Sequence, residues 1–170
     1  GNIFFNKNFI SNLPSYEISK LGIGLVPEGR RIFSNLTVEE NLIVAFRKGY
    51  WDLNKIKKIF PRLSERLTQM SNSLSGGEQQ MLAIARTLMT NPKILILDEA
   101  TEGLSPNLRN EIWTIISEIK KKDVSIILVD KYLNKIKQIA DKLYILDRGE
   151  NAWNGNCLLY TSDAADDRYR

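Results

Sequence analysis

Apolar residues in the second half of the chain follow two alternating patterns. Short apolar runs, too short for helices, predict buried strands at Lys93–Asp98 and Val124–Val129 and a further strand at Lys142–Leu146. Between the runs, apolar residues recur at helical spacing, which predicts a helix that begins at Ser105–Pro106 and another over Leu133–Ala140. Strands that alternate with helices in this way are typical of an α/β fold with a parallel sheet.

The first half of the chain is organised differently. Between about Leu36 and Ser73 no strand pattern occurs, and this stretch is expected to be a helical insert. It opens on the capping box Thr37–Glu40, and Pro61 divides its amphipathic stretch Asp52–Arg66 into two helices. Three short elements are expected before the insert, namely a strand at Ile3–Phe5, a helix at Pro14–Leu21 and a buried strand at Gly22–Val26.

A longer helix is expected from Ser75 to about Thr90, and its first turn is unusual. Ser75 and Glu78 form the Ser-x-x-Glu pattern of a capping box, which is a common helix start. Gly76 and Gly77 lie between them, and each costs the helix about 1 kcal/mol relative to alanine. Glycine lets another group approach the backbone closely, and the N–H groups at a helix start suit an anionic phosphate. The segment is therefore either an ordinary cap or the start of a phosphate-binding helix.

Two carboxylates, Asp98 and Glu99, follow the apolar run that predicts a central strand. Ligands of open α/β sheets bind at the carboxyl ends of the strands. An aspartate there can hold Mg²⁺ directly or through water, and an adjacent glutamate can orient the attacking water in phosphoryl transfer. A single Asp-Glu pair after a strand is ordinary. Its combination with a glycine-rich helix start indicates nucleotide chemistry.

Composition narrows the classes of function. The chain has 170 residues, of which 43% are hydrophobic and 26% charged, as is usual for one globular domain. It has no histidine, which excludes a Ser-His-Asp triad and histidine metal sites. Its one cysteine, Cys157, excludes an internal disulfide and suits the cytosol. The net charge of +4 forms no basic stripe interleaved with aromatics, so we expect no nucleic-acid partner, and no apolar run of 18 residues predicts a membrane span.

Several separated motifs resemble one protein family. Leu74–Gln80 is similar to the signature motif of the ATP-binding subunits of ABC transporters, and Ile94–Asp98 resembles their Walker B strand, with Glu99 as the catalytic glutamate. The resemblance covers about Gly1 to Asn154. Within the family it is closest to the second ATPase subunit of branched-chain amino acid importers, and the stretches that resemble this branch are Gly22–Phe33, Asn35–Leu42, Phe60–Arg66 and Glu102–Pro106.

The resemblance implies a P-loop NTPase-like α/β core and a helical subdomain that carries the signature. In this family two subunits pack head to tail, and each ATP lies between the phosphate-binding loop of one subunit and the signature of the other. The residues of this chain expected to contact the ATP of the partner subunit are Ser75, Gly76, Gly77 and Glu78.

The resemblance also assigns roles at the chain's own nucleotide site. Glu99 would be catalytic. Asp98 and Glu28 would hold Mg²⁺, either directly or through water. Glu28 stands where many relatives have a glutamine that contacts metal and water, and a glutamate is usual in the branched-chain branch. Lys131 stands where many relatives have a switch histidine, so it either offers a cation to the phosphate or is simply solvated.

The sequence departs from the family pattern at one motif above all. The phosphate-binding loop Gly-x-x-x-x-Gly-Lys-Ser/Thr does not occur in it. Since this loop lies upstream of Gly1 in the family, we expect the chain to be an N-terminally truncated fragment that is inactive alone. Ser105 replaces a common aspartate and is expected to cap the following helix rather than to contact nucleotide.

The expected organisation has four parts. Residues 1–35 would be a remnant of the N-terminal core, 36–90 the helical subdomain, and 91–154 the α/β core with the Walker B and switch regions. Residues 155–170 are expected to be a non-native tail, because Cys157–Asp167 resembles a translated sequencing adapter more than a natural acidic tail.

The resulting hypothesis is an ATP-hydrolysing subunit that drives import of branched-chain or similar amino acids. Its cofactors would be ATP and Mg²⁺. Its partners would be a second ATPase subunit, membrane permeases and, indirectly, an amino acid binding protein, with the chain at the cytoplasmic face of the membrane. Two alternatives stay open: a soluble ABC-type ATPase of translation or repair, and a non-catalytic ABC subunit. The sequence does not identify the transported substrate.

Overall fold

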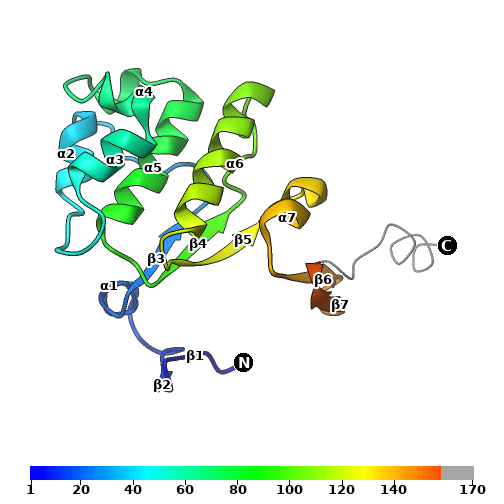
Figure 1. Ribbon diagram of the computed structural model, residues 1–170. Coiled ribbons are helices and arrows are strands. Elements are labelled where there is room, and N and C mark those ends of the chain that lie inside the picture. The colour runs from blue at the N-terminus through cyan, green and yellow to red at the C-terminus, as the bar shows by residue number, and fades with distance from the viewer. Residues whose placement is uncertain (158–170) are drawn as a thin grey trace. The chain divides into compact units, whose positions relative to one another are not determined.

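The computed structural model of the chain describes residues 1–157 (Figure 1). It has two compact units, one of residues 1–129 and one that begins at Asp130, and each is described by itself. The expected tail of residues 155–170 lies outside the described residues from position 158 onward. The expected boundaries between the subdomains 1–35, 36–90 and 91–154 stay predictions.

The N-terminal segment is a small hairpin followed by a short helix. Strands β1 (Phe4–Phe5) and β2 (Asn8–Phe9) pair antiparallel, with both turn residues between them at positive φ. Helix α1 covers Ser15–Lys20, and Pro14 is its N-cap rather than its first residue. The strand predicted at Ile3–Phe5 is confirmed.

The first unit is built on a three-stranded parallel sheet in the order β3-β4-β5. The strands are β3 (Ile23–Val26), β4 (Ile94–Asp98) and β5 (Ser125–Val129), so the predicted central strand is confirmed. Helix α5 (Gly76–Met89) packs against β3. Figure 1 shows it on the same side of the sheet as α6 (Pro106–Lys120). This side buries Val26, Leu95 and Leu97 completely, since none of them has exposed surface.

The opposite face of this sheet is open among the described residues. Leu25, Ile96 and Ile127 are paired across the three strands, and Leu25 and Ile127 are 53% and 51% exposed. The prediction that Val124–Val129 is a buried strand is therefore wrong for β5, whose residues are exposed or half-buried. Only Val124, just before the strand, is buried. An apolar run shows strand character, but burial of both faces depends on what packs on each.

Local sequence signals determine where the helices of the insert begin. Thr37 and Glu40 form the predicted capping box at the start of α2, and the Asp52 side chain accepts a hydrogen bond from the Lys55 N–H at the start of α3. Pro61 begins α4, so the predicted division of the amphipathic stretch is confirmed. The elements of the insert are α2 (Val38–Ile43), α3 (Leu53–Ile59), α4 (Pro61–Ser64) and a 3₁₀ turn (Ser71–Ser73).

Helix α5 is the central element of the helical part. It contacts the helices α2, α3 and α4 of the insert, and it also contacts strand β3 and helix α6. The apolar residues that recur at helical spacing along it are buried, namely Met81, Ile84, Ala85 and Leu88, and so are Leu82 and Met89 outside that face. The helix is therefore surrounded rather than amphipathic, which fixes the position of its N-terminal turn.

The second unit holds a short helix and a hairpin. Helix α7 covers Leu133–Ile139, as predicted. Strand β6 (Lys142–Asp147) pairs antiparallel with β7 (Glu150–Asn156) in a sheet of their own. The prediction that Lys142–Leu146 continues the parallel sheet is therefore wrong, because the turn at Arg148 and Gly149 folds the chain back on itself.

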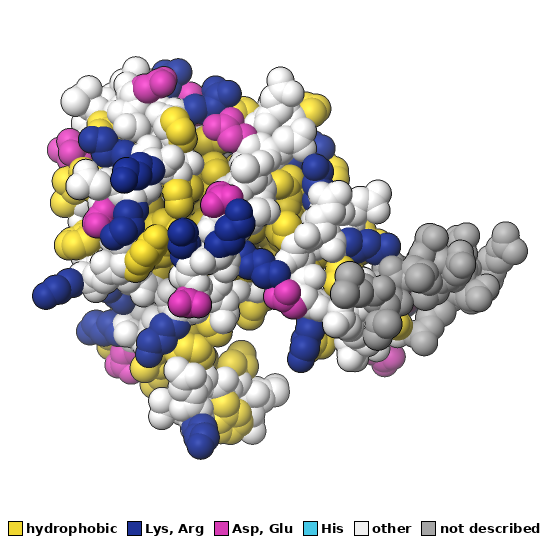
Figure 2. Space-filling view, in the orientation of Figure 1, with side chains coloured by type: hydrophobic (Ala, Val, Ile, Leu, Met, Phe, Trp, Pro, Cys, Tyr) yellow, Lys and Arg dark blue, Asp and Glu magenta, His cyan; other side chains and the backbone are white. Residues whose placement is uncertain are grey.

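Two surface properties bear on function. In the part of the chain that the structure describes, no helix is long and apolar enough to cross a membrane. On the face that Figure 2 shows, Lys and Arg side chains lie scattered among acidic and apolar ones rather than in a continuous stripe.

Candidate functional site

The N-terminal turn of α5 forms the predicted capping box. The Ser75 hydroxyl accepts a hydrogen bond from the Glu78 N–H at 3.4 Å, and Glu78 accepts one from the Ser75 N–H at 2.9 Å. The other carboxylate oxygen of Glu78 lies 3.0 Å from Nε of Arg66. Both oxygens of Glu78 are thus engaged within the chain, and its predicted contact with ATP stays a prediction.

The protonation of Glu78 follows from these contacts. Burial alone raises the pKa of its carboxyl group, since the residue is only 6% exposed. The hydrogen bonds with Ser75 and the positive charges of Arg66 and Arg62 outweigh burial, so the pKa lies below the ordinary glutamate value. The carboxylate of Glu78 in this capping box is therefore charged, and the positive charges of Arg66 and Arg62 stabilise that form.

Each glycine of this turn gives room to a specific group. A Cβ built on Gly76 would lie 2.5 Å from Nη1, 2.7 Å from Cζ and 2.8 Å from Nη2 of Arg30. A Cβ on Gly77 would collide with Cδ1 of Leu108 in α6. The sequence predicts a close approach to these glycines. The groups that approach them here are a guanidinium and a leucine of the same chain.

Three carboxylates come together beyond the carboxyl ends of the strands. Oxygens of Glu28, Glu99 and Glu102 all lie within 4.8 Å of one another, and the three residues are exposed. Glu28 and Glu99 were expected at this site, whereas Asp98 is half-buried and does not belong to the group. Glu102 was missed as a site residue. The Glu102 N–H donates to the Glu99 carbonyl at 3.1 Å, so one turn carries both carboxylates, and the short spacing of Glu99 and Glu102 is the signal that could have identified it.

The backbone at Glu99 is held in a rare conformation. Its φ is +47°, in the left-handed region that non-glycine residues seldom adopt. The Glu99 N–H donates to the Val129 carbonyl at 3.0 Å, which ties the residue to the end of β5. Such strain persists where the surroundings fix it and is concentrated at functional sites.

The chemistry of these donors fits a divalent cation. Three carboxylates this close repel one another, and a bound cation relieves that repulsion. Mg²⁺ takes oxygen ligands and keeps several waters, which suits an exposed group of carboxylates. Glu28, Glu99 and Glu102 can therefore hold such an ion between them.

The segment between β3 and α2 connects these two clusters. Glu28 belongs to the carboxylate group, and Arg30, two residues later, lies on Gly76. Arg30 and Arg31 both have positive φ, at +66° and +43°. Arg86 of α5 donates to the Arg31 carbonyl, so the segment is anchored to the same helix whose first turn it covers.

Lys131 belongs to the second unit, where it is exposed and follows Asp130 directly. Its contact with phosphate stays a prediction. Ser105 is the N-cap of α6 by backbone conformation, but its side chain makes no capping hydrogen bond. The expectation that the Ser105 side chain caps this helix is therefore wrong, and Pro106 at the first helical position starts the helix instead.

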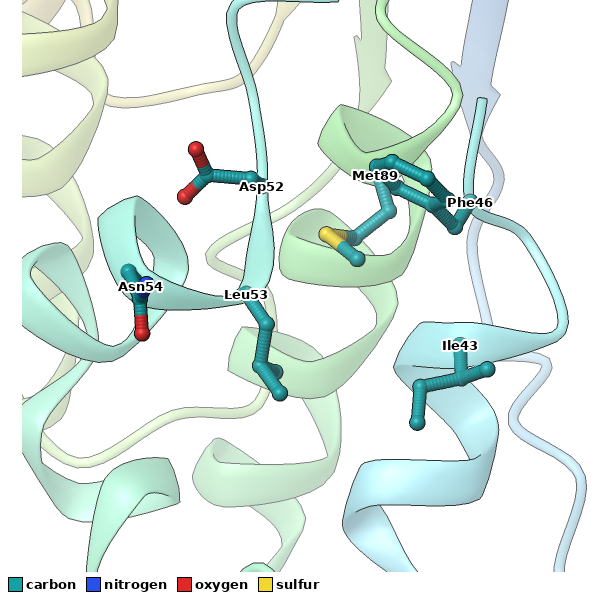
Figure 3. A pocket seen from close by; sticks show the side chains of 6 residues that line it. All are labelled: Ile43, Phe46, Asp52, Leu53, Asn54 and Met89. Carbon is teal, nitrogen blue, oxygen red and sulfur yellow. The ribbon is translucent and has the colours of Figure 1, made fainter. Parts of the chain in front are cut away.

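A separate, mainly apolar pocket lies among the helices of the insert (Figure 3). Ile43 comes from the end of α2, Leu53 from the start of α3 and Met89 from the end of α5. Figure 3 shows the side chains of Phe46 and Met89 side by side. Ile43 and Phe46 are 54% and 49% exposed, so the pocket opens onto an apolar surface.

This chain is similar to known proteins over most of its length. The family described as ABC transporter matches residues 1–102. The high-affinity branched-chain amino acid transport ATP-binding protein BraG of Pseudomonas aeruginosa is 41% identical over 97% of this chain and 70% of its own length. The probable branched-chain amino acid transport ATP-binding protein LivF of Archaeoglobus fulgidus is 36% identical over 91% of this chain and 68% of its own.

More distant relatives and solved structures agree on the fold. The Nod factor export ATP-binding protein I of Rhizobium meliloti is 31% identical over 81% of this chain and 43% of its own length. The crystal structure of a nucleotide-free ATP-binding cassette from an ABC transporter matches with a TM-score of 0.75 and 26% identity, over 92% of this chain and 69% of that one. The chain therefore belongs to the ABC transporter family, among its ATP-hydrolysing subunits.

Proposed function

We propose that this ATPase subunit drives import of branched-chain or similar amino acids. The observation that carries the proposal is the 41% identity with BraG across nearly the whole chain. The second relative with a branched-chain name, LivF, supports the same cargo. Nod factor export by a relative of lower identity makes other cargo the alternative that a transport assay must exclude.

In this proposal the carboxylates beyond β3 and β4 perform hydrolysis. Glu99 orients the attacking water and accepts its proton, and its fixed backbone presets the carboxylate for this role. Glu28 and Glu102, grouped with Glu99, would hold Mg²⁺. Asp98, which lies outside this group, would reach the ion through water. When bound, the ion neutralises charge on the phosphates of ATP.

The start of α5 would serve the other nucleotide of a head-to-tail dimer. The free N–H groups of its first turn and the positive end of its dipole suit the terminal phosphate of ATP held by the partner subunit. Ser75, Gly76 and Gly77 form this turn, and Gly77 is buried against α6, which keeps it rigid. Each subunit would thus complete the site of the other.

The apolar pocket of the helical insert is our proposed docking surface for a membrane permease. Ile43 and Phe46 of its lining and the neighbouring Val44 are exposed, and such exposed apolar groups mark contact surfaces. A permease helix with apolar side chains suits this pocket in shape and chemistry. The subunit would then lie at the cytoplasmic face of the membrane, where ATP is available.

The test is ATP turnover and uptake by the assembled transporter in vesicles. Glu99→Gln should lower turnover by about a hundredfold or more while ATP binding persists. The matched control is Glu65→Gln, which changes an exposed glutamate at the end of α4 and should leave turnover unchanged. Wild-type turnover no faster than that of Glu99→Gln would instead identify a non-catalytic subunit.

Cargo is tested in the same vesicles. ATP-dependent uptake of leucine, with galactose and a Nod-type oligosaccharide as competitors, should be specific for the amino acid. If ATP-dependent uptake of leucine does not saturate as the leucine concentration rises, the proposed cargo is wrong. The assignment as an ATPase subunit would be unaffected.

A further inference from the structure

The guanidinium of Arg30 lies over the first turn of α5. It occupies the space that a side chain at position 76 would fill, with Nη1, Cζ and Nη2 all within 2.8 Å of the Cβ that Gly76 lacks. Because Gly76 has no side chain, the guanidinium of Arg30 can lie against the turn that is proposed to bind phosphate.

The surrounding structure fixes the backbone on either side of Arg30. Arg30 and the residue after it both have positive φ, a costly backbone arrangement for two consecutive non-glycine residues. Arg86 donates to the Arg31 carbonyl and lies over the Phe33 ring, 4.5 Å from its centroid. Asn41 binds both backbone groups of Phe33 at 3.0 Å. These contacts fix the segment on both sides of Arg30.

The charges around Arg30 are unfavourable without an anion. A cation at the positive end of a helix is repelled by the helix dipole. Two arginines of the segment that precedes this turn have carboxylate partners, since Arg66 pairs with Glu78 at 3.0 Å and Arg62 with Glu111 at 2.9 Å. Within residues 1–157, no carboxylate forms an ion pair with Arg30. Among the described residues, the Arg30 guanidinium therefore lies against a helix start without a carboxylate partner.

We propose that Arg30 is a phosphate-binding residue of the trans site. Its guanidinium and the N–H groups at the start of α5 together bind the terminal phosphate of the ATP held by the partner subunit. This inference rests on the proposed head-to-tail dimer. An arginine fork binds two phosphate oxygens at once, and it would select ATP over ADP because ADP lacks the terminal phosphate.

The experiment follows ATP-driven dimerisation of the full ATPase subunit by light scattering, in a Glu99→Gln background that preserves ATP. Arg30→Ala should raise the ATP concentration for half-maximal dimerisation by about tenfold to a hundredfold. Arg30→Lys should recover part of the affinity, since it restores the charge without the fork. The weak response to ADP should be the same in all variants.

Arg31→Ala is the matched control. It removes the same charge from the next residue, which is exposed and has the same left-handed backbone, and it should leave the ATP response unchanged. Circular dichroism confirms that each variant is folded. If Arg30→Ala dimerises at the wild-type ATP concentration or below it, Arg30 only fills space and the inference is overturned. If the parent protein does not dimerise with ATP, the proposed trans site fails, and the inference fails with it.

Discussion

The side chain of Asn41 binds both backbone groups of Phe33. Its Oδ1 accepts a hydrogen bond from the Phe33 N–H at 3.0 Å, and its Nδ2 donates to the Phe33 carbonyl at 3.0 Å. The Ser71 hydroxyl donates to the same carbonyl at 2.8 Å, and Asn41 has no exposed surface. Helix α2 thereby fixes the segment that carries Glu28 and Arg30.

Asn41→Ala should therefore destabilise the fold by about 1–3 kcal/mol, because it leaves backbone groups of Phe33 without partners. Urea unfolding monitored by circular dichroism measures the change. Asn35→Ala alters an exposed residue of the same segment and should stay within about 0.5 kcal/mol of wild type. Equal losses for the two variants would show that the buried network contributes nothing special.

The two glycines of the α5 turn should differ in their tolerance of alanine. Gly77→Ala collides with Leu108 and should cost about 1–3 kcal/mol, as overpacking does. Gly76→Ala meets only the end of the flexible Arg30 side chain and should cost less, since alanine favours the helix. Unfolding of both variants in urea gives the comparison.

A double-mutant cycle identifies the cause at Gly77. Leu108→Ala removes the obstructing methyl group, so the double variant should lose less stability than the sum of the single losses. Strictly additive losses would place the cost of Gly77→Ala elsewhere than at Leu108.

Stability should fall in acid partly through Glu78. Its pKa is lower in the folded chain than the ordinary value of about 4.3, so folding favours the charged form. The stabilisation is complete above that ordinary value and is lost as pH falls through the lower folded pKa. Glu78→Gln should remove this part of the pH dependence from thermal unfolding measured between pH 7 and pH 3.

Arg66→Gln offers an independent check on Glu78. It removes a positive charge that lowers the Glu78 pKa in the folded chain, so the loss of stability in acid should be smaller and should be complete at a higher pH. A profile that neither substitution changes would mean that other groups cause the acid sensitivity.

Glu102→Gln should weaken the dependence of ATP turnover on Mg²⁺. The substitution removes one carboxylate from the group with Glu28 and Glu99, and about tenfold more Mg²⁺ should be needed for half-maximal turnover. A Mg²⁺ titration of the assembled transporter measures this, with Glu65→Gln as the exposed control. An unchanged titration, together with a strong effect of Asp98→Asn, would assign the ion to Asp98 instead.

The features predicted most reliably from the sequence are those determined by residues close together in the chain. The helix starts at Thr37 and Ser75 are capping boxes, in which the partners are three residues apart, and both form as expected. Strand β4 was identified from its short apolar run between two helical patterns. These features need no knowledge of the rest of the chain.

Features that depend on distant residues were missed. The exposure of β5 depends on which segments cover its faces. The pairing of β6 with β7 is by contrast local, and the turn at Arg148 and Gly149 that causes it was not predicted. The contact of Arg30 with Gly76 joins residues far apart in the sequence, so spacing alone does not reveal it. The sequence marked Gly76 as a point of close approach without identifying the group that approaches.

The open face of the parallel sheet bears on how much of the protein survives in a cell. It combines the exposed apolar side chains Leu25 and Ile127 with β3 and β5 as edge strands among the described residues. Chaperones and proteases engage such surfaces, and aggregates grow from them. The abundance of the folded chain in a cell therefore depends on what covers this face. Chaperones and proteases would remove copies whose face is uncovered, whatever the catalytic activity of those copies.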